Sequence, residues 1–186
     1  MIYSTQGVPE EHIKSTYENF DWTEKKILKQ YLEGFVNGTR DVGMVFIGKP
    51  GVGKTHLMAA TYFALQQNDV LPGSDVVFFD YQCLLNHLRE GFSLKISADA
   101  AMERLCRVRY LIIDDIKPES RGEFWKEILE LIFEYCYNNK TKILLSTNAD
   151  SKDELVERWG MADYHVSRLS HMADIMVLKG KDRRAE

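Results

Sequence analysis

The sequence predicts an α/β fold in which a mostly parallel sheet of five strands is covered by helices on both faces. Short apolar, β-branched runs alternate along the chain with segments whose apolar residues recur at helical spacing. A glycine-rich loop also lies between the first such strand and the helix that follows it. In sheets of this kind, ligands bind at the carboxyl ends of the strands, so we expect the functional site at that edge.

The strands are expected at 42–47, 75–79, 110–113, 142–146 and 175–178. Helices are expected at 22–35, 54–67, 81–89, 99–107, 124–137 and 155–159. Thr23 and Asp80 are placed to cap the first and third helices, and 91–97 should interrupt the pattern after the third. Ser151 followed by Glu154 forms a capping-box pattern that opens the last helix.

Length and composition indicate one domain over residues 1–186, with an N-terminal strap and helix in 1–40 and a core in 41–186. Hydrophobic residues make up 45% of the chain and charged residues 28%, and no apolar run is long enough to cross a membrane. No signal peptide is recognised at the start. Cys83, Cys106 and Cys136 are isolated and odd in number, so we expect a reducing, cytoplasmic location without disulfides or a zinc site.

The run GKPGVGKT fills every fixed position of the phosphate-binding loop pattern G-x-x-x-x-G-K-[ST]. Glycines allow successive backbone N–H groups to point at the phosphates of ATP or ADP, and the following helix adds the positive end of its dipole. Lys54 is expected to contact the β- and γ-phosphates, and the Thr55 hydroxyl to bind Mg²⁺. The alternative is a glycine-rich turn without a ligand. The predicted cofactor-binding residues are Gly48, Lys49, Pro50, Gly51, Val52, Gly53, Lys54, Thr55 and His56.

Two further strands end in polar residues that suit this loop. The strand LII is followed by Asp114, a candidate partner of Mg²⁺, and by Asp115, a candidate base for an attacking water. The next strand is followed by Asn148, which could hold that water or sense the γ-phosphate. Either motif alone is more often a turn at the end of a strand. Together with the loop they predict hydrolysis of a nucleoside triphosphate.

These motifs, with VPEEHIKSTYENFDW near the start and HVSRLSHMADIMVLKGKDRR at the end, make the chain resemble a known family. The resemblance is to the DnaC/DnaI helicase loaders and the IstB transposition helper ATPases of the AAA+ superfamily. It implies the three-layer sandwich of P-loop NTPases of the AAA+/ASCE type, with strand order 5-1-4-3-2. It also implies that Arg168 is an arginine finger acting on the ATP site of a neighbouring subunit in a homo-oligomer. The alternative is a surface arginine paired with a nearby acid.

The same resemblance implies three kinds of partner: single-stranded DNA, and a replicative helicase or a transposase. Its DNA-binding segment corresponds here to the basic stretch that contains Phe92, Lys95 and Arg104, where an aromatic ring beside cations suits stacking and phosphate contact. A net charge of −4 argues against binding nucleic acid through overall charge. Other candidate cations are Arg89, Arg107, Arg109, Lys179, Lys181, Arg183 and Arg184.

The sequence departs from the family pattern in four places. Only about forty residues precede the phosphate loop in this sequence, so we expect no separate helicase-gripping domain within it. Little follows the last strand, so we also expect the helical lid to be absent or minimal. Cys136 stands where the family often has arginine, and Lys117 where glycine usually follows the acidic pair.

Other function classes remain open at this stage. A small-molecule phosphotransferase would share the phosphate loop, but no arginine-rich lid segment is recognised. A GTPase is disfavoured because no N-K-x-D motif is present. A regulatory scaffold could bind nucleotide and turn it over negligibly, acting through loops ordered by the γ-phosphate.

Overall fold

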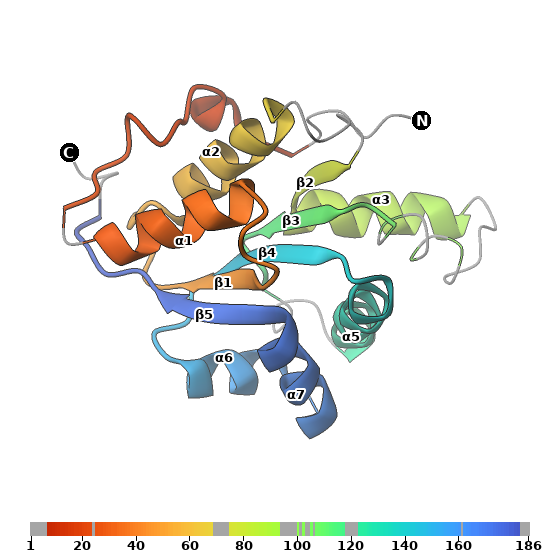
Figure 1. Cartoon of the computed structure of the whole chain (residues 1–186). Helices are drawn as coiled ribbons and strands as arrows, with labels where there is room; N and C mark the ends of the chain where they lie inside the picture. The colour runs from red at the N-terminus through yellow and green to blue at the C-terminus, as the bar shows by residue number, and fades with distance from the viewer. Residues whose placement is uncertain are drawn as a thin grey trace.

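The computed structural model describes residues 7–23, 25–68, 75–93, 100, 102, 105, 107–117, 123–160 and 162–182. Its strands are β1 (Gly43–Ile47), β2 (Val76–Asp80), β3 (Tyr110–Asp114), β4 (Lys142–Thr147) and β5 (Ala173–Val177). Its helices are η1 (Glu10–His12), α1 (Lys26–Val36), α2 (Lys54–Gln66), α3 (Tyr81–Ser93), α5 (Glu123–Asn139), α6 (Lys152–Trp159) and α7 (Asp163–Met172) (Figure 1).

The strands form one parallel sheet in the order β2-β3-β4-β1-β5. This arrangement is the predicted order 5-1-4-3-2 read from the other edge. β4 lies between β1 and β3, where Met44 pairs with Leu144 and Leu144 with Ile112. The carboxyl ends of β1, β4 and β3 are therefore neighbours, and this places the phosphate loop, Asn148 and the acidic pair at one edge.

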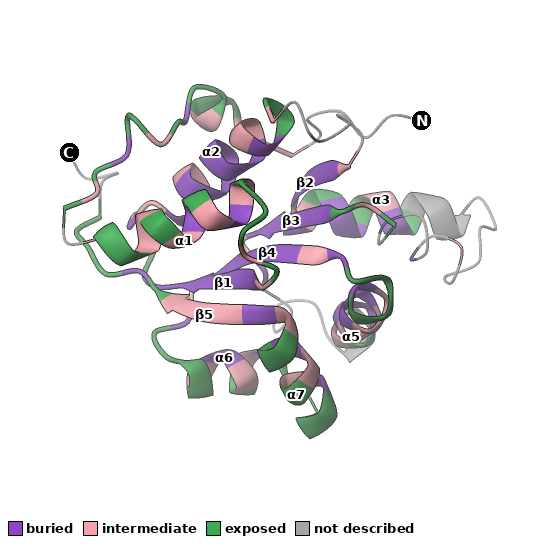
Figure 2. Cartoon of the chain, in the orientation of Figure 1, coloured by how far each residue is buried: buried purple, intermediate pink, exposed green. Residues whose placement is uncertain are grey.

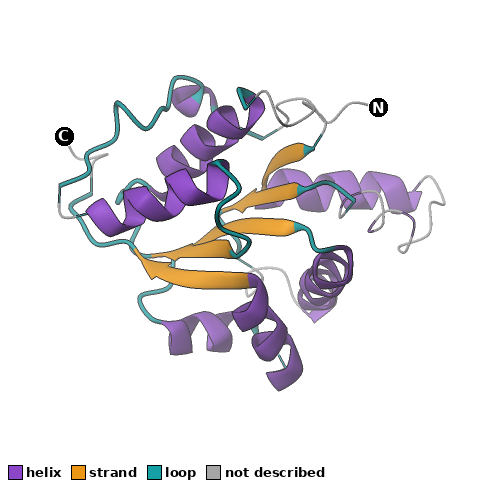
Figure 3. Cartoon of the chain, viewed as in Figure 1, coloured by secondary structure: helices purple, strands orange, loops and turns teal. Residues whose placement is uncertain are grey.

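Side chains alternate between the two faces of the sheet and form two hydrophobic cores. On one face, alternate strand residues such as Phe46 and Ile112 pack against α1 and α2. On the other face, residues such as Val45 and Ile113 pack against α3, α5, α6 and α7. Helices thus cover both faces, as Figure 3 shows. β1 to β4 are almost wholly buried between them, whereas the edge strand β5 is mostly half-buried (Figure 2). Burial on both faces explains why the strands read as continuous apolar runs.

The predicted strands and helices are present, with differences at several ends, except that most of the helix predicted at 99–107 lies outside the described residues. α1 begins at Lys26, and Thr23 does not cap it; Asp21 instead accepts a hydrogen bond from the backbone N–H of Thr23. The indole N–H of Trp22 donates to the carbonyl of Tyr17, which holds this segment outside the helix. α3 continues through Gly91 to Ser93, so the predicted break at 91 is wrong.

The region after β4 differs most from the prediction. Ser151 caps α6 by accepting from the N–H of Glu154, as predicted, while the Glu154 carboxylate accepts from the N–H of Asp150. A second helix, α7, follows and was not predicted, because only His165 and Leu169 of its residues are buried and its apolar periodicity is weak. β5 begins directly after α7, at Ala173. No helix among the described residues is long and apolar enough to span a membrane.

Candidate nucleotide-binding site

The phosphate loop joins β1 to α2 and has the backbone geometry that its glycines allow. Gly51 and Gly53 adopt φ values of +78° and +97°, which L-residues with a side chain rarely adopt. The space beside each of these glycines is also occupied by another residue. A Cβ on Gly53 would lie 2.8 Å from the Phe20 ring, and a Cβ on Gly51 would overlap the carboxylate of Asp182. The N-terminal strap and the C-terminal segment therefore pack against the loop from outside and fix its shape.

Lys54 lies at the first position of α2 and its side chain is directed back over the loop. Its ammonium donates to the carbonyls of Gly48 and Lys49 at 2.6 and 2.9 Å, and to Oδ1 of Asn148 at 2.8 Å. No side chain caps the N-terminus of α2, so its first N–H groups remain available to an anion. Lysine and helix N-terminus together form an anion site of the kind that binds phosphates.

Asp114 is the most buried charged group at this edge. Its carboxylate accepts a hydrogen bond from the Ser146 hydroxyl and another from Thr55. Burial raises the pKa of Asp114, and these two hydrogen bonds act in the opposite direction. The pairing of a carboxylate with the Thr55 hydroxyl provides the hard oxygen ligands that Mg²⁺ prefers. No described group of three or more His, Cys, Asp or Glu could hold a metal ion, so Mg²⁺ here would depend on phosphate and water ligands as well.

The raised pKa of Asp114 has a consequence for stability. When the folded-state pKa of an acid lies above its unfolded value, stability falls as pH rises between the two values and stays lowered above them. We expect Asp114→Asn to raise the melting temperature of the nucleotide-free chain by a few degrees at pH 7 to 8 and to abolish Mg²⁺-dependent stabilisation by ATP. The gain should shrink as the pH is lowered through the folded-state pKa. Thermal melts across pH, with and without Mg-ATP, measure both effects; a melting temperature lowered at every pH would contradict the expectation.

Asp115 follows β3 in a left-handed backbone conformation with φ of +57°. Its N–H donates to the Ser146 hydroxyl at 2.9 Å, which fixes the turn. One carboxylate oxygen accepts from the Asn148 amide at 3.1 Å, and the other accepts from Lys117 at 2.5 Å. A continuous chain of hydrogen bonds therefore joins Lys54 to Asn148, Asn148 to Asp115, and Asp115 to Lys117.

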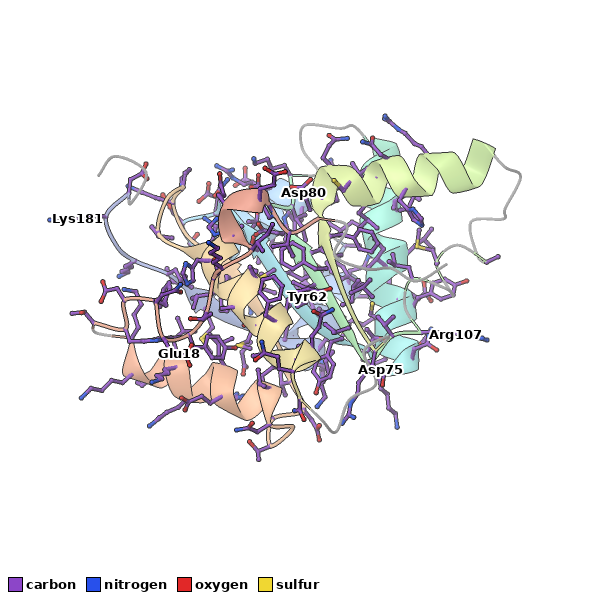
Figure 4. The ribbon with its side chains drawn as sticks, turned by 90° about the horizontal axis from the view of Figure 1, so that it is seen from above. Glu18, Tyr62, Asp75, Asp80, Arg107 and Lys181 are labelled. Atoms are coloured by element: carbon purple, nitrogen blue, oxygen red, sulfur yellow. The ribbon has the colours of Figure 1, made fainter. Side chains whose placement is uncertain are left out.

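These groups line one cavity of about 470 Å³. Pro9, Glu11 and His12 of the N-terminal strap form part of its wall, and Asp80 contributes from the end of β2. The view in Figure 4, from above the sheet, shows Asp80 at one end of β2 and Asp75 at the other. Of the predicted cofactor-binding residues, the structure brings six to this cavity: Pro50, Gly51, Gly53, Lys54, Thr55 and His56.

The remaining three predicted loop residues contribute in other ways. Gly48 and Lys49 offer their carbonyls to Lys54, and Val52 is buried in the core below the loop. The predicted metal residues Thr55 and Asp114 lie together, as do the predicted catalytic residues Asp115 and Asn148.

Arg168 is not in this cavity. It lies on α7, where its guanidinium is 3.5 Å from the Glu134 carboxylate and stands over the rings of Tyr137 and Tyr164 at 5.5 and 5.4 Å. Its side chain is 29% exposed. Arg168 therefore has a partner acid within its own chain and cannot be counted among the groups that line this chain's nucleotide cavity.

Three features of the site were not predicted. Ser146 bridges Asp114 and the backbone of Asp115, and its only signal is a hydroxyl inside an apolar strand. The Lys117 ion pair and the wall contributed by the N-terminal strap have no local sequence signal, because they depend on tertiary placement. The predicted DNA-binding residues Lys95 and Arg104, and the Phe92 side chain, lie outside the described residues.

The known proteins to which this chain is similar agree with a nucleotide-binding site at this position. The family described as IstB-like ATP binding protein matches residues 11–186. The chain belongs to this family. Among curated relatives, the replicative helicase loader DnaC of Buchnera aphidicola is 24% identical over 159 residues, covering 81% of this chain and 62% of that protein. The phage-like element PBSX protein XkdC of Bacillus subtilis is 28% identical over 152 residues, covering 78% and 52%. The chain thus spans between half and two thirds of these relatives.

Solved structures support the fold. The DnaC helicase loader superposes with a TM-score of 0.77 at 22% identity, covering 92% of this chain and all of that one. DnaI gives 0.70 at 18% identity, covering 95% and 94%. The replication initiator DnaA, solved with AMPPCP and single-stranded DNA, gives 0.72 at 19% identity, covering 94% of this chain and 51% of DnaA. The fold of this IstB-like protein is therefore that of the P-loop AAA+ proteins.

Proposed function

We propose that this IstB-like protein is an ATPase that binds ATP with Mg²⁺ and acts in DNA replication as a helicase loader or primosome component. The observation that supports it most is the hydrogen-bonded chain from Lys54 through Asn148 to Asp115. It joins the phosphate-binding lysine to the candidate base through the candidate sensor Asn148.

Each residue has a defined task in this proposal. The loop N–H groups and Lys54 bind the phosphates, while Thr55 and Asp114 hold Mg²⁺, which neutralises charge on the phosphates when bound. Asp115 accepts a proton from the attacking water, and Asn148 orients that water. Arg168 of a neighbouring subunit stabilises the charge that develops on the transferred phosphoryl group. We further propose that the chain forms a homo-oligomer and that ATP controls its binding to single-stranded DNA and to a replicative helicase.

Two alternatives keep the same site. A transposition helper ATPase would differ in its partner, a transposase, and the IstB-like family description supports this reading. A nucleotide-binding scaffold with negligible turnover is favoured by one contact, the ion pair between Lys117 and Asp115, because it occupies the second oxygen of the candidate base. Phosphate release measured with and without single-stranded DNA separates the scaffold from the ATPase.

Lys54→Ala is expected to weaken ATP binding about 10- to 100-fold, because a charge-assisted hydrogen bond to phosphate is worth about 1.5–3 kcal/mol. Titration with a fluorescent ATP analogue measures the change. Lys152→Ala is the matched control, since Lys152 is an exposed lysine at the first position of another helix and does not line the cavity. Full-strength binding by the Lys54 variant would remove the loop from the nucleotide site.

A further inference from the structure

A second cavity of about 470 Å³ lies at the opposite edge of the sheet from the nucleotide site. It is bounded by the residues that precede β3 and β4 and by the ends of α5 and α7. In Figure 4, Arg107 and Asp75 mark this amino edge of the sheet, away from Asp80. The lining of this cavity includes Asp41, Arg109, Tyr137, Lys140, Lys142 and His171.

The charges around this cavity are predominantly positive. Lys142 is nearly buried and is committed to Asp41, whose carboxylate lies 2.8 Å from its ammonium. Arg109 and Lys140 also line the cavity, and in the described part of the chain neither forms an ion pair with an acid. Among the described residues of the lining, Asp41 is the only acid. Three permanent cations thus face one carboxylate, in a chain whose net charge is −4.

Two of the lining residues lie at the C-terminal ends of helices. Lys140 follows the last residue of α5, and His171 is in the last turn of α7, where the negative end of each helix dipole favours a positive charge. Lys140 has a φ of +56°, in a turn closed by the N–H of Thr141 donating to the carbonyl of Cys136 at 3.0 Å. Nδ1 of His171 forms a hydrogen bond with the carbonyl of Ser167, and Nε2 is the ring nitrogen that remains for another partner. The backbone at Lys140 is therefore fixed at a helix end, where a positive charge is favoured.

An aromatic ring completes the cavity wall. Tyr137, near the end of α5, is 44% exposed even though the Arg168 guanidinium stands 5.5 Å from the centre of its ring, and it precedes Lys140 by about one turn. Proteins that bind single strands combine cations that follow the phosphates with aromatic rings on which bases stack. A site for inorganic phosphate alone would not require an aromatic ring.

We infer that this cavity is a nucleic-acid site, in which Arg109 and Lys140 bind phosphates of a single strand and Tyr137 stacks a base. The inference rests on the proposed binding of single-stranded DNA and assigns it to residues outside the stretch 92–104. The site is separate from the nucleotide cavity, since the two share no lining residue. Strand and ATP can therefore occupy the chain at the same time.

The double variant Arg109→Gln with Lys140→Gln tests this site through salt dependence. Each phosphate contact to a single strand contributes about 0.7 to the slope of log K against log salt. We expect a slope shallower by about 1.4 and, at 0.1 M salt, an affinity lower by about 20-fold. The readout is fluorescence anisotropy of a labelled oligo(dT). The control double variant, Lys26→Gln with Lys152→Gln, removes two exposed lysines of other surfaces and should keep the wild-type slope.

Tyr137→Leu tests the stacking contact separately. It should weaken oligo(dT) binding several-fold and leave the binding of an abasic strand of equal length unchanged. If the Arg109 and Lys140 double variant binds oligo(dT) with wild-type affinity and slope, the proposed location of the site is wrong. The proposal that the chain binds single-stranded DNA is then unaffected. If the wild-type chain binds no strand, DNA binding itself is wrong as well, whereas the Lys54 test of the nucleotide site is unaffected. If the wild-type chain binds inorganic phosphate at this cavity but does not bind oligo(dT), the assignment of the cavity to nucleic acid is wrong.

Discussion

Asp115→Asn is expected to lower ATP turnover by about 10²- to 10⁴-fold while ATP binding stays close to wild type, because loss of a general base typically costs that much. The asparagine keeps the shape of the side chain and can still accept from Asn148. It cannot take up a proton from water, and it gives up the ion pair with Lys117. Single-turnover phosphate release, combined with a binding titration, separates the two effects.

Asp80→Asn is the appropriate control for that variant. Asp80 is another carboxylate at the edge of the same cavity, but its oxygen caps α3 by accepting from the N–H groups of Gln82 and Cys83. Its substitution should change turnover by no more than a few-fold. Equal losses in both variants would indicate a general effect of cavity charge, and unchanged turnover in Asp115→Asn would remove Asp115 from the mechanism.

Arg168→Ala is expected to produce the largest loss, about 10³- to 10⁵-fold in turnover, the range measured when an arginine finger is removed from phosphoryl-transfer sites. The contacts that hold Arg168 on its own subunit do not prevent this role. Its pairing with Glu134 is 3.5 Å long and both side chains are partly exposed, and such surface pairs contribute about 0–1 kcal/mol. Assembly could therefore release Arg168 at little cost.

The binding step should respond differently. Because Arg168 is remote from its own nucleotide cavity, Arg168→Ala should bind ATP as a single subunit with unchanged affinity. Turnover assayed over a range of protein concentrations checks the dependence on assembly. Wild-type turnover in Arg168→Ala would show that the arginine is a surface residue paired with Glu134.

The nucleotide site could be predicted from sequence to an unusual extent because its chemistry is encoded by short, contiguous segments. The phosphate loop runs from Gly48 to Thr55, and Asp114, Asp115 and Asn148 each follow a buried strand. Strand ends in a parallel sheet meet at one edge, so fixing the strands also brings these residues together. The strand order itself was implied by family resemblance and is confirmed by the pairing of β1 with β4 and β5.

The features that escaped prediction depend on distant contacts. α7 has few buried residues, so periodicity could not reveal it. The packing of the C-terminal segment on the phosphate loop is visible only in three dimensions: Asp182 lies against Gly51, and the carbonyl of Leu178 lies against Gly48. Lys117 departs from the family pattern, but its ion pair with Asp115 depends on the turn at Asp115, where φ is +57°.

Mixing two inactive variants tests most directly whether ATP is hydrolysed in a site shared by two subunits. Lys54→Ala keeps Arg168 but binds ATP poorly, and Arg168→Ala binds ATP but supplies no finger. Each should release little phosphate alone, whereas an equimolar mixture should recover a substantial fraction of wild-type release, because some interfaces combine an intact pocket with an intact arginine. A mixture no more active than the sum of its separate components would contradict the shared site.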